Sequence, residues 1–146
     1  MKTNELYTKA AAYCSIAERC RQEVRDKLLA WDSDSADTYE EILQRLETEG
    51  FLNEGRYARA FANDKLRFQG WGRLKIRAAL QAKHVSSAAI AEALAELDEN
   101  TYRKKLCQLR ERKERELRHE KDEFTKRQKI SRFLLGRGFT MEEVLT

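Results

Sequence analysis

The chain repeats one helical pattern three times. Val24, Ile76 and Ile130 are equivalent: each follows an arginine by three residues and precedes a leucine by four. Further along, each copy has a hydroxyl residue followed four residues later by a β-branched residue, as in Ser86 and Ile90. A helix end, a hydroxyl cap and a new apolar helix face would produce this pattern. Three copies in 146 residues predict stacked helical units, which usually present an extended binding surface.

The composition indicates an all-α chain. It contains no proline and six glycines, and proline is the main interrupter of helices. Charged residues make up 37% of the chain, against about 25% in ordinary globular domains, so much of the helical surface must be solvated. We therefore expect several thin interfaces between helices in place of one thick core.

Apolar spacing and capping residues locate the helices. They predict helices over about residues 4–19, 21–31, 38–50, 53–68, 73–83, 86–97, 101–123 and 126–135, and a short one from residue 140. Residues 32–37 form a polar hinge, and Thr38 with Glu41 fits a capping box at the next helix. The helix from residue 101 has few apolar side chains. It should project from the body or lie on it with one narrow face.

Several classes of function are excluded by what the chain lacks. Three cysteines, an odd number, argue against a disulfide framework and favour buried, reduced thiols in a cytoplasmic protein. His84 and His119 are isolated, so we expect no zinc site. No apolar run reaches the roughly 20 residues that span a membrane, and no secretory signal begins the chain. Without a catalytic constellation or a phosphate-binding loop, we expect no enzyme and no cofactor.

Charge is unevenly distributed along the chain. Residues 53–83 carry eight basic and two acidic side chains, and residues 101–146 carry 14 and eight. Residues 84–100, between these blocks, carry four acidic side chains and no basic one, and residues 1–52 carry 11 acidic and seven basic ones. This segregation favours a surface that meets nucleic acid or an acidic protein groove, although charge runs can also serve only to solvate exposed helices.

The first basic block also contains aromatic residues. Tyr57 and Phe61 lie four residues apart and should face the core. Trp71, between two glycines, either fills a junction between helices or anchors a partner, and the burial preference of tryptophan favours the first role. Arg73 and Arg77 share a helix face, and arginines without acidic neighbours suit bidentate contacts with phosphates or carboxylates.

These residues resemble a known family. Residues 46–61, which read LETEGFLNEGRYARAF, are followed by Lys65 and by residues 70–76, GWGRLKI. Together they closely resemble the central signature of RecX regulatory proteins. Residues 14–20 (CSIAERC) and 132–139 (RFLLGRGF) are similar to that family's first and third units. One departure is Asn53-Glu54-Gly55, where the family usually has an acidic pair before the arginine.

The resemblance implies a fold and a function. The fold is an elongated, curved all-α array of three tandem three-helix repeats, here residues 1–50, 51–98 and 99–146. The function is that of a bacterial cytoplasmic modulator of the RecA recombinase. Members of the family bind along the groove of the RecA–single-stranded DNA filament and generally suppress ATP hydrolysis, strand exchange and co-protease activity. Some members also bind DNA directly.

The expected partner-binding residues are the cations of the second and third units. They are Arg56, Arg59, Lys65, Arg67, Arg73, Lys75, Arg77, Lys83, Arg110, Lys113, Arg127 and Arg132. We expect them to converge along one concave flank of a monomer that binds the RecA filament. Two alternatives stay open: a helical module that binds DNA without RecA, and a helical adaptor for another acidic protein.

Overall fold

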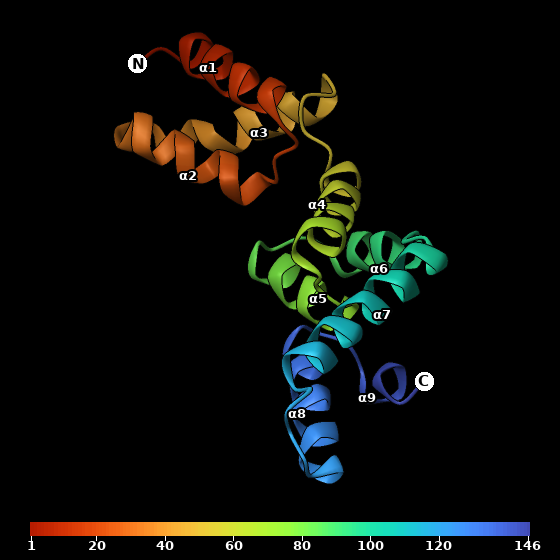
Figure 1. The fold of residues 1–146 in the computed structure, drawn as a ribbon. Coiled ribbons are helices and arrows are strands. Elements are labelled where there is room, and N and C mark those ends of the chain that lie inside the picture. The colour runs from red at the N-terminus through yellow and green to blue at the C-terminus, as the bar shows by residue number, and fades with distance from the viewer.

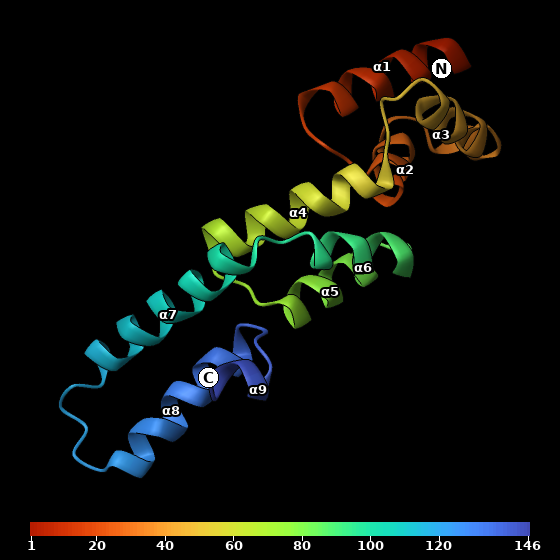
Figure 2. The same ribbon diagram turned by 90° about the vertical axis from the view of Figure 1, so that its right-hand side faces the viewer.

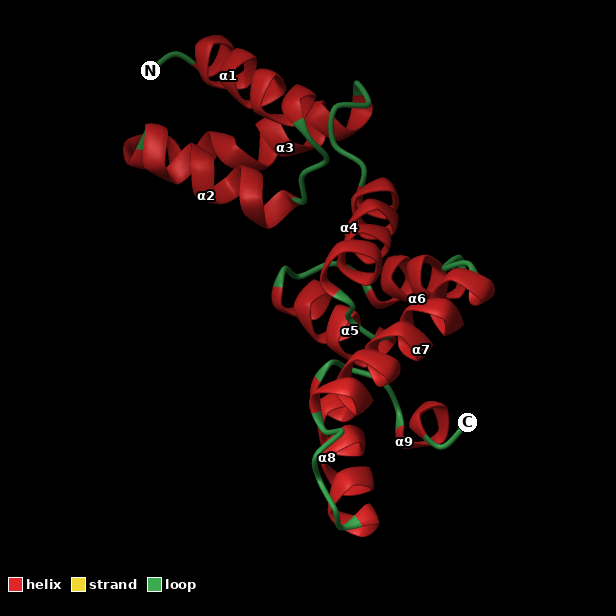
Figure 3. Cartoon of the chain, viewed as in Figure 1, coloured by secondary structure: helices red, strands yellow, loops and turns green.

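The computed structural model describes residues 1–146 and contains helices but no strand (Figure 3). In chain order these are α1 (Thr3–Ile16), α2 (Arg21–Trp31), the short 3₁₀ helix η1 (Ser33–Thr38), α3 (Tyr39–Thr48), α4 (Glu54–Gln69), α5 (Arg73–Ala82), α6 (Ser87–Ala95), α7 (Glu99–Glu116), α8 (Glu123–Gly136) and α9 (Met141–Val144). They form three successive groups along an elongated molecule (Figures 1 and 2). The predicted all-α array of three tandem three-helix repeats is confirmed.

The first unit, α1 to α3, has a core of its own. Leu6, Val24, Leu28 and Leu46 are each 0% exposed and pack with the other apolar residues of these three helices. Their spacing of three, four or seven residues along each helix places them on one face, which is turned toward the other helices. The first unit is therefore a separately packed body at the N-terminal end of the molecule (Figure 1).

The second and third units share a single core. Leu66 of α4, Ile76 of α5, Tyr102 of α7 and Leu134 of α8 belong to one continuous cluster of buried side chains. Phe139, which follows α8, is 0% exposed in the same cluster. The two units therefore pack as one body, and of the first unit only Cys20, which precedes α2, belongs to the same cluster.

Two glycines join the second unit to the third. The backbone N–H of Gly72 donates to the carbonyl of Arg137 at 2.8 Å, and that of Leu74 donates to the carbonyl of Gly138 at 3.0 Å. A Cβ on Gly72 would lie 2.5 Å from the carbonyl carbon of Gly138, and Gly138 has a φ of +99°. Because both glycines lack a side chain, the turns before α5 and after α8 can approach backbone to backbone.

The hydroxyl caps are confirmed in the second and third copies of the repeat but not in the first. Ser86 and Thr140 each accept a hydrogen bond from a backbone N–H three residues on. Thr38 makes no cap, so the predicted capping box with Glu41 is wrong. Its hydroxyl donates instead to the carbonyl of Ser35 inside η1, because the polar hinge folds into a 3₁₀ turn that occupies the hydroxyl.

The predicted helix over residues 101–123 is also wrong at its end. α7 stops at Glu116, and a turn leads into α8, which begins at Glu123. Asp122 is the N-cap of α8, and its carboxylate accepts from the backbone N–H of Thr125 at 3.3 Å. Aspartate is a preferred N-cap residue because its carboxylate accepts from the free backbone N–H groups of the first helical turn. α7 and α8 form a hairpin at one end of the molecule (Figure 2).

The cysteines only partly match the expectation of buried thiols. Cys14 and Cys20 are buried, and burial raises the pKa of both thiols, which keeps them protonated and unreactive. Cys107 is exposed, so the prediction is wrong for this residue. It lies on the outer face of α7, whose apolar positions are few.

Candidate partner-binding surface

The structure divides the twelve candidate cations into two groups. Eight lie in or at the ends of α4 and α5, and four lie in α7 and α8. The two groups differ in pairing and not in position. In one group the cationic head is bound by carboxylates or carbonyls of the chain itself. In the other group the head has no such partner. This division decides which of the predicted residues remain available to another molecule.

Arg56 and Lys83 fasten the first unit to the second. Arg56 Nε donates to Glu18 Oε1 at 2.5 Å, and its Nη2 donates to the carbonyl of Gly50 at 3.1 Å. Lys83 Nζ lies 3.6 Å from Glu23 Oε2. Glu18 and Glu23 lie just before and within α2, whereas Arg56 and Lys83 belong to the second unit. Both expected contacts therefore have a structural role at this junction.

Arg73 is largely enclosed by other groups of the chain. Its guanidinium lies 4.0 Å from the centroid of the Tyr102 ring and pairs with Glu99 at 2.8 Å and with Glu143 at 3.4 Å. Its side chain is only 23% exposed. These partners belong to α7 and α9, so Arg73 connects the second unit to the third and has little surface to offer a partner.

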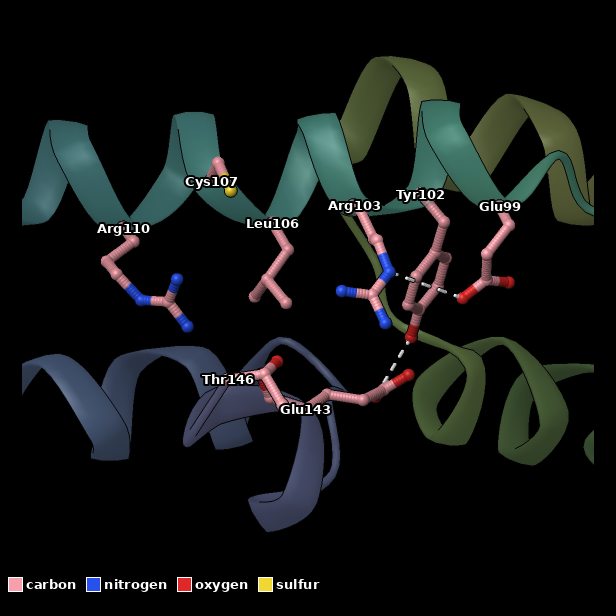
Figure 4. A pocket seen from close by; sticks show the side chains of 8 residues that line it. All are labelled: Glu99, Tyr102, Arg103, Leu106, Cys107, Arg110, Glu143 and Thr146. Atoms are coloured by element: carbon pink, nitrogen blue, oxygen red, sulfur yellow. Dashed lines mark hydrogen bonds and ion pairs between the residues drawn. The ribbon is translucent and has the colours of Figure 1, made fainter.

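A small pocket beside this ion pair belongs to the same network (Figure 4). Tyr102 Oη donates to Glu143 Oε1 at 3.1 Å and accepts from the backbone N–H of Arg73. Burial raises the pKa of Tyr102 to about 12. Arg110 donates to the carbonyl of Val144 at 2.8 Å and so holds the end of α9. The pocket holds about 80 Å³, well below the roughly 300 Å³ of typical cofactor sites.

Two further candidates make ion pairs at the surface. Arg59 lies 3.6 Å from Glu96, and Lys113 lies 3.3 Å from Glu116. Exposed pairs of this kind contribute about 0–1 kcal/mol and exchange readily with solvent or another anion. Unlike Arg73, neither residue is enclosed between two units by its ion pairs.

Lys65 and Lys75 flank Trp71. Each ammonium lies 4.7 Å from the centroid of the indole, and the indole packs edge-on against Phe61 at a centroid distance of 6.4 Å. Trp71 is partly buried and packs on the shared core, as expected for a side chain that fills a junction between helices. Neither lysine makes an ion pair, so the two ammonium groups frame an aromatic surface at the turn between α4 and α5.

Four of the candidate arginines are exposed and make no ion pair in the chain: Arg67, Arg77, Arg127 and Arg132. They come from α4, α5 and α8, and so from both of the units that share a core. With Lys65 and Lys75 they form the available set, the six candidates whose cationic groups are held neither by a carboxylate nor by a carbonyl of the chain. No three His, Cys, Asp or Glu side chains are grouped so that they could hold a metal ion.

The prediction from sequence missed the exposed apolar residues of the last two helices. Phe124 is 68% exposed and Leu145 is 76% exposed. Phe124 and Leu135 are eleven residues apart, which is three helical turns and places them on one face. This spacing could have indicated an apolar stripe that the core of the chain does not use.

The chain is similar to known proteins over nearly its whole length. Residues 53–94 match the family model described as "RecX, second three-helix domain", and residues 101–145 match "RecX, third three-helix domain". A regulatory protein RecX of Prosthecochloris aestuarii is 31% identical over 99% of this chain and 96% of its own length. One from Escherichia coli O7:K1 is 29% identical over 95% of this chain and 87% of its own length.

Other relatives are longer, and solved structures share the fold. The chain spans 56% of a regulatory protein RecX of Clostridium perfringens, with 34% identity. The crystal structure of RecX from Lactobacillus salivarius superposes with a TM-score of 0.85 over 97% of this chain and 91% of that one, at 25% identity.

No helix combines the length and apolar composition needed to cross a lipid bilayer.

Proposed function

The chain belongs to the RecX family of regulatory proteins, and on this premise we propose that it binds the RecA–single-stranded DNA filament and inhibits it. Inhibition would cover recombinase, ATPase and co-protease activity. We propose further that the chain acts as a cytoplasmic monomer without catalytic activity of its own. The repeat boundaries at residues 1–50, 51–98 and 99–146 are part of this proposal.

The observation that carries the proposal is the available set of cations. Arg67, Arg77, Arg127 and Arg132 are exposed and unpaired, and Lys65 and Lys75 are unpaired beside Trp71. Guanidinium groups free of internal partners can bind phosphates and carboxylates in bidentate geometry. A protein filament on single-stranded DNA offers both kinds of anion.

The fold suits an extended partner. The second and third units share one core and are tied by Arg73 and by the Gly72–Gly138 contact. Cations on these two units are therefore held at fixed separations along the molecule. A rigid array of this kind loses little conformational entropy when it binds a regular, repeating surface.

The direct test is the RecA ATPase on single-stranded DNA, measured while the chain is titrated in. We expect the rate to fall and to reach a plateau at saturation. Filament length, imaged in the same samples, separates filament shortening from inhibition of an intact filament. An unchanged rate and unchanged filaments at saturating protein would exclude the proposal.

The same exposed arginines favour one second candidate, a helical module that binds DNA without RecA. Affinity for bare DNA should then fall steeply with salt, by a slope close to the number of phosphates neutralised. Tight binding to the filament with negligible affinity for bare DNA would exclude this alternative.

A further inference from the structure

The exposed apolar residues of the chain are concentrated at one place. Nine large apolar side chains are exposed in the whole molecule, and four of them line one groove between α8 and α9. The four are Phe124, Leu135, Met141 and Leu145. The groove holds about 540 Å³. Soluble proteins seldom gather exposed apolar side chains in this way unless another molecule covers them.

Both helices present these residues on the side turned away from the core. In α8, Ile130, Phe133 and Leu134 pack on the core, while Phe124 and Leu135 are exposed on the other side of the helix. In α9, Val144 is buried, while Met141 and, just after the helix, Leu145 are exposed. Each helix thus has a second apolar face that packing within the chain does not use.

The charge at the groove has one sign. Arg127 and Arg132 line it and make no ion pair, and its remaining polar lining is Gln128 and Ser131. On the helical wheel, Arg127 and Arg132 flank the stripe of Phe124 and Leu135 on either side. No carboxylate lines the groove. Apolar side chains between two unpaired guanidinium groups are complementary to an apolar segment with flanking carboxylates.

We propose that the α8–α9 groove is a docking site for an acidic amphipathic helix of a partner protein. Phe124 and Leu135 are separated by about 16 Å along α8, which matches three turns of a docked helix. Apolar side chains of the docked helix would cover the stripe, and its flanking Glu or Asp residues would pair with Arg127 and Arg132. The inference rests on the proposed function only in that the partner is another protein.

A second copy of this chain is a less complementary occupant. A two-fold contact through this groove would bring the Arg127 and Arg132 side chains of both copies against one apolar interface. Like charges at such an interface disfavour association. Self-association is therefore an outcome that the test must detect, and it would contradict the proposal.

The test uses the full chain and a fluorescein-labelled helical peptide of about 18 residues, with Leu along one face and Glu elsewhere. Fluorescence anisotropy measures its binding. The variants Phe124→Ser with Leu145→Ser, and Arg127→Glu with Arg132→Glu, should each weaken binding roughly tenfold. The control variants Leu29→Ser and Lys104→Glu make the same kinds of change at exposed sites elsewhere and should bind as the parent does. A peptide with Lys in place of Glu should not bind.

Equal binding by parent and groove variants would overturn the proposal. So would a concentration-dependent dimer in sedimentation that the groove variants abolish, because a second copy would then occupy the groove. The RecA ATPase assay separates this inference from the proposed function. Peptide binding at the groove without any ATPase effect would refute only the proposed function, and ATPase inhibition by the chain without peptide binding would refute only the groove.

Discussion

The contact between Gly72 and Gly138 can be tested by adding one methyl group. In Gly72→Ala the new Cβ would lie 2.5 Å from the carbonyl carbon and oxygen of Gly138 and 2.6 Å from the N of Phe139. All three are backbone atoms, so no flexible side chain can move aside. Gly72 has φ −81° and ψ 172°, which any residue adopts, so the cost comes from the steric clash and not from the backbone conformation.

The size of the effect follows from the contacts between the two turns that the new methyl group would break. Overpacking of a tight contact costs about 1–3 kcal/mol. If the two turns move apart, the hydrogen bonds from Gly72 N–H and Leu74 N–H are lost, at about 0.5–1.5 kcal/mol each. Alanine also restricts the unfolded chain, which offsets about 0.4–1 kcal/mol. We expect Gly72→Ala to lower the free energy of unfolding by roughly 1–5 kcal/mol.

The assay is urea unfolding followed by tryptophan fluorescence. The chain has two tryptophans, Trp31 in the first unit and Trp71 in the second, so a Trp31→Phe background reports only on the shared core. Gly136→Ala is the matched control, because nothing lies within 4 Å of its Cβ and the helix of α8 gains about 0.5–1 kcal/mol. Equal midpoints for Gly72→Ala and Gly136→Ala would refute the reasoning.

Three further predictions follow from the network and the caps. Arg73→Gln should lower the free energy of unfolding by roughly 2 kcal/mol, because Glu99 and Glu143 lose their partner. Arg77→Gln, at an exposed arginine without an ion pair, should leave the free energy of unfolding unchanged. Denaturant titration of both variants measures the difference. Ser86→Ala should lower the stability measured by thermal unfolding by about 1 kcal/mol, because it removes the N-cap of α6. An equal loss of stability in Ser87→Ala, at the neighbouring serine that makes no cap, would contradict the assignment. Burial raises the pKa of the Tyr102 hydroxyl from 10.0 to about 12, so the folded state favours its protonated form; this stabilisation is present below pH 10 and is lost as pH rises to about 12. Stability measured across that range should fall less in Tyr102→Phe, and identical pH profiles would refute the claim.

Much of the fold could be predicted because helical spacing is a local signal. The three equivalent leucines, Leu28, Leu80 and Leu134, are each 0% exposed, so the repeat identified the core-facing helices correctly. The misplaced end of α7 and the missing cap at Thr38 arose where two local signals compete. A polar stretch can continue a helix, turn or cap the next one, and tertiary packing decides among these.

The candidate site was less predictable, because ion pairing is not local. The sequence shows that Arg73 lacks acidic neighbours in its own helix, yet it pairs with Glu143, 70 residues away. Arg56 likewise pairs with Glu18, 38 residues earlier. Only the packing of the units brings these carboxylates to the arginines. Spacing along one helix therefore identifies cations that share a face but not those that are free to bind.

The most direct test of the central claim is co-sedimentation with RecA filaments on single-stranded DNA. It compares the parent chain with a variant in which Arg67, Arg77, Arg127 and Arg132 are all changed to Glu, with Lys104→Glu as the control for a single exposed charge. We predict that the parent and the control bind the filament and that the fourfold variant, still helical by circular dichroism, does not. Undiminished binding by the fourfold variant would contradict a filament-binding surface built from these arginines.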